Sequence, residues 1–210
     1  SETADDTEAT IEANKGKTVN VTLTRTLKAN VWNTICLPFD VIADQVKDVL
    51  KAEGNVRVFA SVDGNCINFK EATEMKAGIP YLIKPTENTD ELIFNGVTIS
   101  ENAAQSNDGV SKAGDISIEG TYGKKALETD GTELFLTVSG HFAKPAASTN
   151  TMRGFRAYFI SLLGLSSAKI NIDGQITAIN GIIAADDAAN AKVYNLNGQY
   201  VGNSLNGLAK

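Results

Sequence analysis

Asp-Gly and Asn-Gly pairs are the feature of this sequence that most narrows the folds open to it. Eight such pairs recur between residues 63 and 207: Asp63-Gly64, Asn95-Gly96, Asp108-Gly109, Asp130-Gly131, Asp173-Gly174, Asn180-Gly181, Asn197-Gly198 and Asn206-Gly207. These pairs readily adopt the positive φ angles of tight hairpin turns. Two of them join short alternating runs, residues 56–60 to 66–69 and residues 169–172 to 175–179, which predicts two β-hairpins.

Further strands are predicted by alternation of apolar and polar residues. In residues 18–28, valine and leucine alternate with asparagine and threonine, which indicates a long strand with one polar face toward solvent. Residues 35–39, 134–138 and 155–159 repeat the pattern. Pro38 cannot donate a ladder hydrogen bond, so it marks a strand end or an edge position.

One helix is predicted over residues 42–50. Ile42, Val46, Val49 and Leu50 share one helical face, and Gly54 follows the expected end. Two polar stretches rich in small residues, 101–115 and 143–151, are expected to be exposed loops.

The predicted fold is therefore all-β and mainly antiparallel: a β-sandwich with one short helix and a small C-terminal hairpin segment. We expect residues 1–16 to form a flexible N-terminal segment and residues 17–180 to form the sandwich domain. Residues 181–210 are expected to be a linker and a C-terminal β-hairpin tail.

Size and charge limit the partners. A chain of 210 residues suits one large β domain, or a domain of about 150 residues with a small appendage. The formal net charge of -6 argues against nucleic acid or an anionic membrane as partner, because both repel an acidic surface.

The sequence contains no apolar run that is long enough to span a bilayer. Residues 1–8 are acidic and polar, unlike a signal peptide, and indicate a mature or trimmed end.

The two cysteines, Cys36 and Cys66, allow two interpretations. A disulfide between them would close a 30-residue loop and contribute about 3–4 kcal/mol. Alternatively, Cys36 is a small buried side chain of an apolar strand and Cys66 lies free near a hairpin. Two cysteines alone do not make a zinc site.

Residues for catalysis are few. The single histidine, His141, follows Ser139-Gly140 directly after an apolar strand, so a strand end and turn explain it more simply than a catalytic triad. The nearest carboxylate pairs are Glu71 with Glu74 and Asp90 with Glu91, a pattern common on solvated faces. Calcium-loop, His/Cys and phosphate-loop motifs are missing from the sequence. We therefore predict no enzymatic activity, no cofactor and no metal site.

Three segments resemble a known class of bacterial surface protein. They are Trp32-Asn33-Thr34-Ile35-Cys36-Leu37-Pro38-Phe39, Ala77-Gly78-Ile79-Pro80-Tyr81-Leu82-Ile83-Lys84-Pro85 and Arg153-Gly154-Phe155-Arg156-Ala157-Tyr158-Phe159. In this order they are similar to the WNTLCLPF, AGKPYLIK and FRAYF blocks of adhesin-like β domains in secreted and surface-anchored proteins of Bacteroides-type gut bacteria. The resemblance covers most of residues 17–180. It implies an extracellular or cell-surface location and a role in cell adhesion.

The C-terminal residues carry a second resemblance. Residues 191–201 look like the start of C-terminal sorting-type domains on secreted proteins of the same bacterial phylum. Those domains end with a further strand that opens with Gly-Ile-Tyr, whereas this sequence stops at Leu208-Ala209-Lys210.

Candidate ligand-binding residues come from the same motifs. Aromatic residues could form a sugar platform, although strand alternation favours core packing; they are Trp32, Phe39, Tyr81, Phe155, Tyr158 and Phe159. Arg153 and Arg156 flank Phe155 and are interpreted either as ion-paired surface residues or as ligands of an acidic group. Tyr81, Arg153, Arg156 and Tyr158 are therefore the predicted binding residues.

The function expected from the sequence is a non-catalytic adhesion or binding module that recognises a host or matrix protein or a glycan. One alternative is a carbohydrate-binding accessory module of a polysaccharide-degrading system, which predicts an exposed row of two or three aromatic side chains. A second is a structural or assembly subunit with an open sheet edge, for which self-association is expected.

Overall fold

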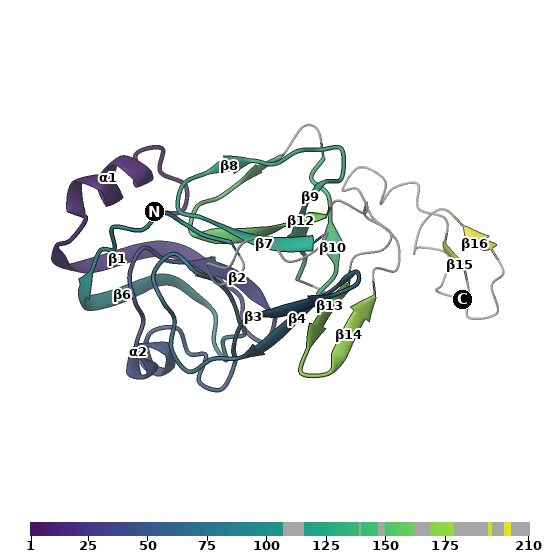
Figure 1. Cartoon of the computed structure of the whole chain (residues 1–210), viewed down its shortest axis with the longest axis horizontal. Coiled ribbons are helices and arrows are strands. Elements are labelled where there is room, and N and C mark those ends of the chain that lie inside the picture. The colour runs from purple at the N-terminus through teal and green to yellow at the C-terminus, as the bar shows by residue number, and fades with distance from the viewer. Residues whose placement is uncertain are drawn as a thin grey trace.

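The computed structural model describes residues 1–106, 116–138, 140–146, 150–161, 169–178, 193–194 and 200–202. These residues form mainly β-strands with two short helices (Figure 1). Most strand pairs are antiparallel, which confirms the predicted all-β, mainly antiparallel fold. No helix among these residues has the length and apolar character needed to cross a membrane.

A six-stranded sheet in the order β14-β13-β4-β3-β5-β2 is the central layer. Its strands are β2 (Asn33–Cys36), β3 (Val56–Asp63), β4 (Cys66–Glu71), β5 (Pro80–Ile83), β13 (Lys169–Ile172) and β14 (Gln175–Ala178). β13 and β4 run parallel, and the other neighbours run antiparallel. The two predicted hairpins are β3–β4 and β13–β14, and positive φ angles occur at Gly64, Asp173 and Gly174 in their turns. β2 ends at Cys36, so Pro38 follows a strand end as predicted.

A four-stranded sheet packs on one face of this layer. Its order is β10-β9-β12-β7, with β7 (Ile116–Thr121), β9 (Glu133–Leu136), β10 (Phe142–Ala143) and β12 (Arg156–Ser161). Buried side chains from both sheets form one apolar cluster, which includes Phe69 and Leu82 from the first sheet and Leu134 and Phe159 from the second. This pair of layers is the predicted sandwich.

The other face of the six-stranded sheet is covered by a two-stranded ribbon, β1 (Thr18–Leu27) with β6 (Thr89–Thr98), and by helix α2 (Ala43–Asp48). Along β5, Leu82 belongs to one apolar cluster while Tyr81 and Ile83 belong to the other. A strand covered on both faces needs apolar residues at every position, which explains the unbroken apolar run in β5.

Two smaller strand pairs complete the described structure. β8 (Lys125–Ala126) pairs with β11 (Thr151–Met152), and β15 (Val193–Tyr194) pairs antiparallel with β16 (Tyr200–Gly202). The second pair agrees with the predicted C-terminal hairpin. Four of the turn pairs, Asp108-Gly109, Asn180-Gly181, Asn197-Gly198 and Asn206-Gly207, lie outside the described residues.

The Asn95-Gly96 pair does not connect two strands. It lies inside β6, where the register with β1 shifts between Val19 and Val21, and Gly96 has φ = 66°. The N–H of Gly96 donates to Oδ1 of Asn20 at 2.9 Å. The positive φ is thus used by a β-bulge in place of a hairpin turn.

Helix α2 confirms the predicted helix with shorter bounds. Val46 and Leu50 are buried in the apolar cluster to which the ribbon also contributes, but Ile42 precedes the helix and is 53% exposed. The four-residue spacing therefore predicted the buried face correctly and misplaced its first member.

The N-terminal segment differs from the expectation. Residues 1–16, here called the N-terminal arm, were expected to be flexible, but they contain helix α1 (Thr7–Asn14) and the buried residues Glu2, Thr7 and Ile11. The described part of the chain thus has two short helices where the sequence predicted one. The physical reason is that contacts with distant residues order the arm, as described below.

Both cysteines are free. Cys36 is in β2 and Cys66 is in β4, and strands β3 and β5 lie between them in the sheet. Three strand spacings of about 4.8 Å separate the two cysteines far beyond the Cα distance that a disulfide can bridge. The disulfide interpretation is therefore wrong, and the interpretation of free thiols holds.

Candidate functional site

Glu2 anchors the N-terminal arm to the body of the protein. Its carboxylate accepts hydrogen bonds from Arg153 Nη1 at 3.0 Å and from Arg156 Nη2 at 2.5 Å. Its backbone N–H donates to the C=O of Thr24 in β1, and its C=O accepts from the N–H of Gly154. A Cβ at Gly154 would lie 2.4 Å from the C=O of Tyr122, so a glycine is needed where the arm meets this turn.

A buried arginine in β1 lies close to the same anchor. Arg25 is 1% exposed, and its guanidinium donates to the C=O groups of Phe155 and Thr34. Phe155 adopts φ = 56°, and its C=O also accepts the N–H of Cys36. The pKa of Arg25 is lowered to about 9, mainly by burial and also by nearby Arg156, while Glu2 opposes the change. The carboxylate of Glu2 thus compensates a group of arginines.

Helix α1 covers the ribbon only thinly. Its sequence is TEATIEAN, and Ile11 is its one large apolar residue. Ile11 is buried against the core, while Thr7 Oγ1 donates to backbone oxygens of Ser1 and Ala4. Asp5 forms an ion pair with Lys124 beside the helix. One aliphatic side chain is too little to fill the space between a helix and a strand.

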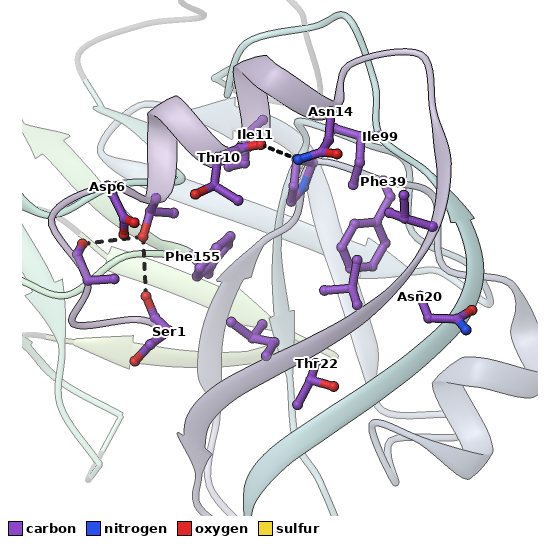
Figure 2. Close-up of a pocket in the computed structure, with 16 residues that line it drawn as sticks. Ser1, Asp6, Thr10, Ile11, Asn14, Asn20, Thr22, Phe39, Ile99 and Phe155 are labelled. Carbon is purple, nitrogen blue, oxygen red and sulfur yellow. Dashed lines mark hydrogen bonds between the residues drawn. The ribbon is translucent and has the colours of Figure 1, made fainter.

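The space that remains is a groove of about 370 Å³ between α1 and β1. Figure 2 shows α1 above the groove and β1 below it, with Phe39 and Ile99 between them. The floor and walls are apolar: Ile11, Val19, Val21, Leu23, Phe39 and Ile99. Val19 and Val21 are only half-buried. Ser1, Asp6, Thr10 and Asn14 form a polar rim. An open apolar groove with a polar rim is typical of a binding site, and its size lies in the range of ligand pockets.

The four residues predicted to bind a ligand do not meet in one hollow. Arg153 and Arg156 line a shallow hollow of about 310 Å³ that contains neither predicted tyrosine. Both arginines bind Glu2 of the same chain, so the ion-paired interpretation describes them. Their role in the groove is indirect, because they hold the arm that forms one wall.

The two predicted tyrosines are buried. The hydroxyl of Tyr81 accepts the N–H of Lys76 at 2.9 Å. Tyr158 has Lys125 Nζ 5.0 Å from its ring centroid, and burial raises its pKa to about 12. Both side chains pack in the interior, as strand alternation favours.

Trp32, the single tryptophan, is half-buried beside a second hollow of about 270 Å³. Arg57 and Lys84 lie over its ring, at 5.6 and 6.0 Å from the centroid. These cations occupy positions that a stacked sugar would need. Wherever burial is described, the aromatic side chains are buried or half-buried, so those residues do not provide the exposed row that a sugar platform predicts.

Groups for catalysis are also sparse among the described residues. No three His, Cys, Asp or Glu side chains lie together there as a metal site would require. The carboxyl groups with a shifted pKa have it lowered: Asp173 by Arg57, Asp130 by the N–H of Thr132, and Asp40 by Ala77 and Lys76 although burial opposes the change. A general acid needs the opposite shift.

Sequence reasoning missed the groove and its anchor. The burial of Arg25 could have been predicted, because Arg25 lies on the same face of β1 as Leu23 and Leu27. No sequence pattern indicated the role of Glu2, since the two arginines that it binds are more than 150 positions away in the chain.

The chain matches no family model, no curated protein and no solved structure in the three comparisons with known proteins.

Proposed function

We propose that this chain is a non-catalytic binding module of an extracellular or cell-surface adhesion protein, which recognises a host or matrix protein or a glycan. The observation that carries the proposal is the open groove between α1 and β1, whose apolar floor includes the half-buried Val19 and Val21. Exposed apolar surface inside a rimmed groove is a common mark of an interaction site. The resemblance of the sequence motifs to adhesin-like domains supports the location and the role.

A protein partner fits this groove better than a glycan. Sugars are held by stacking on aromatic rings and by many polar groups, whereas the floor here is mostly aliphatic. Phe39 and Phe155 line the groove but are buried, at 1% and 7% exposure. Burial of aliphatic side chains from a partner would gain about 25 cal/mol per Å² of apolar surface removed from water.

The test is an array of matrix proteins and glycans probed with the purified chain and with two matched variants. Val21→Lys places a charge on the groove floor, and Val138→Lys makes the same change at an exposed site near the end of β9. Circular dichroism and thermal unfolding check that both variants fold. We expect binding to at least one matrix protein, retained by Val138→Lys and lost in Val21→Lys.

If the folded wild-type chain bound no protein and no glycan on the array, that result would contradict the proposed function. A hit confined to glycans would favour the carbohydrate-binding alternative over a protein partner. If folded Val21→Lys still bound a matrix protein, the adhesion function would be supported, but the binding surface would lie outside the groove.

A further inference from the structure

Among the described residues, the strand that borders the groove, β1, has one edge without a neighbouring strand. β1 pairs with β6 on one side, and the register is continuous from Val21 to Thr24. The C=O of Thr24 accepts the N–H of Glu2 at 3.1 Å, so it points to the other side. Backbone groups alternate between the two sides of an antiparallel strand. The N–H and C=O of Thr22, two residues earlier, therefore also point away from β6.

This free edge faces the groove. Thr22 and Asn20 belong to its lining, and α1 forms the opposite wall (Figure 2). Among the described residues, Glu2 is the only backbone partner of β1 on this side. Glu2 thus makes one hydrogen bond to the edge of β1, as the first residue of an added strand would. The N-terminal arm then turns away from the edge and forms α1.

The floor beneath the edge selects the side chains of an occupant. In a strand added beside Thr22, alternate side chains would point toward Val21 and Leu23, and the others toward solvent. Val19 and Ile99 extend the apolar surface along the groove. Aliphatic residues at every second position match this surface.

Acidic side chains in and near the groove restrict the charge of the occupant. The only charged side chain in the lining is Asp6. On the far strand of the ribbon, Asp90 and Glu91 are exposed, and Glu91 lies opposite Thr24 in the register. With a net charge of -6 on the whole chain, these acidic groups favour a basic occupant.

We propose that the groove binds an extended basic segment of a partner protein, which joins the free edge of β1 as an added strand and places aliphatic side chains on the groove floor. This inference rests on the proposed binding function and names the class of its partner. Backbone hydrogen bonds to Thr22 supply the register, and the floor and the acidic rim supply the selectivity.

The probe is a fluorescein-labelled nonapeptide in which valine alternates with lysine and threonine, titrated with the full chain in low salt and followed by fluorescence anisotropy. One counterpart has glutamate in place of lysine, and another is N-methylated at alternate amides so that it cannot form a strand ladder. Asp6→Asn tests the rim, with Asp44→Asn in α2 as its matched control.

We expect saturable binding of the basic peptide, weakened about tenfold or more by either peptide change or by Val21→Lys. Val138→Lys and Asp44→Asn should bind as the wild type does. Asp6→Asn should bind about two- to fivefold more weakly, and added salt should reduce this difference.

Absence of saturable binding up to about 1 mM peptide overturns the inference, as does equal binding of the N-methylated peptide. Sedimentation of the chain alone tests the other occupant: self-association abolished by Val21→Lys would assign the groove to a second copy and reject the partner segment. A matrix-protein hit that persists while every peptide fails rejects the strand-addition mode and leaves the adhesion function intact.

Discussion

The carboxylate of Glu2 lies 2.5 Å from Nη2 of Arg156, although the two residues are 154 positions apart in the sequence. Together with the backbone hydrogen bonds that join Glu2 to Thr24 and to Gly154, the contact holds the N-terminal arm between β1 and the turn before β12. Ile11 and the Asp5–Lys124 ion pair also hold the helix that forms one wall of the groove.

Glu2→Gln should destabilise the fold by about 2–3 kcal/mol, because it removes the charge that compensates Arg25 and Arg156. Chemical denaturation monitored by circular dichroism measures the change. Glu87→Gln, at an exposed position, is the matched control and should change stability by less than about 0.5 kcal/mol. Equal effects of the two changes would show that the anchor contributes little.

Gly120→Ala should destabilise the protein by about 1–3 kcal/mol, since the added Cβ would lie 2.5 Å from Sγ of Cys36. Adding Cys36→Ala removes that sulfur and should recover part of the loss, measured as non-additivity in a double-mutant cycle. Purely additive effects would place the strain elsewhere, for instance at the C=O of Gln105, 3.2 Å from the same Cβ.

Cys36 should resist thiol reagents in the folded protein. Burial raises the pKa of its thiol to about 12, and only the thiolate reacts. With an aromatic disulfide reagent at pH 8, we expect slow reaction of the half-buried Cys66 alone, and reaction of both thiols after unfolding. In Cys66→Ala the folded protein should show no reactive thiol, and rapid labelling there would contradict the burial of Cys36.

The ion pair between Asp173 and Arg57 should stabilise the protein in a pH-dependent way. Arg57 lowers the pKa of Asp173 in the folded state, so the stabilisation is present above the unfolded carboxyl pKa of about 3.9 and is lost as the pH falls through the lower folded value. Since the Asp173 side chain is 54% exposed, the effect should stay below about 1 kcal/mol.

Urea unfolding of wild type and Asp173→Asn at a series of pH values measures this. The difference between them should be constant from pH 7 to pH 5 and should disappear in strong acid. Asp63→Asn, in the other hairpin, controls for the loss of a charge. A difference that grew on acidification would contradict the assigned sign.

The strand pattern was predictable because each hairpin is a local feature. Asp173-Gly174 has its partner strands immediately beside it in the sequence, and the threonine face of β1 is exposed as its alternation predicts. Asn95-Gly96 shows the limit of this reasoning, since the same dipeptide chemistry serves a bulge as well as a turn.

The groove was not predictable for a different reason. It exists because Ile11 alone packs between α1 and the half-buried Val19 and Val21, and because Glu2 finds two arginines late in the sequence. Neither the meeting of the arm with residues 153–156 nor the space left beneath α1 has a local sequence pattern. The sequence singled out Arg153 and Arg156 as ion-paired or ligand-binding residues, but Glu2, which binds both, lies in a segment that was expected to be flexible.

The parallel pairing of β4 with β13 has a consequence for biosynthesis. Asn68 and Asn171, which are hydrogen-bonded across these strands, are 103 positions apart. At translation rates of about 5–20 residues per second, β4 would emerge from the ribosome ~5–20 s before the strand that covers its edge. Throughout that interval the nascent chain carries an unprotected template for pairing with other chains. Slow synthesis of residues 72–172 would prolong the exposure, so the yield of folded protein should depend on how quickly that stretch of the message is translated.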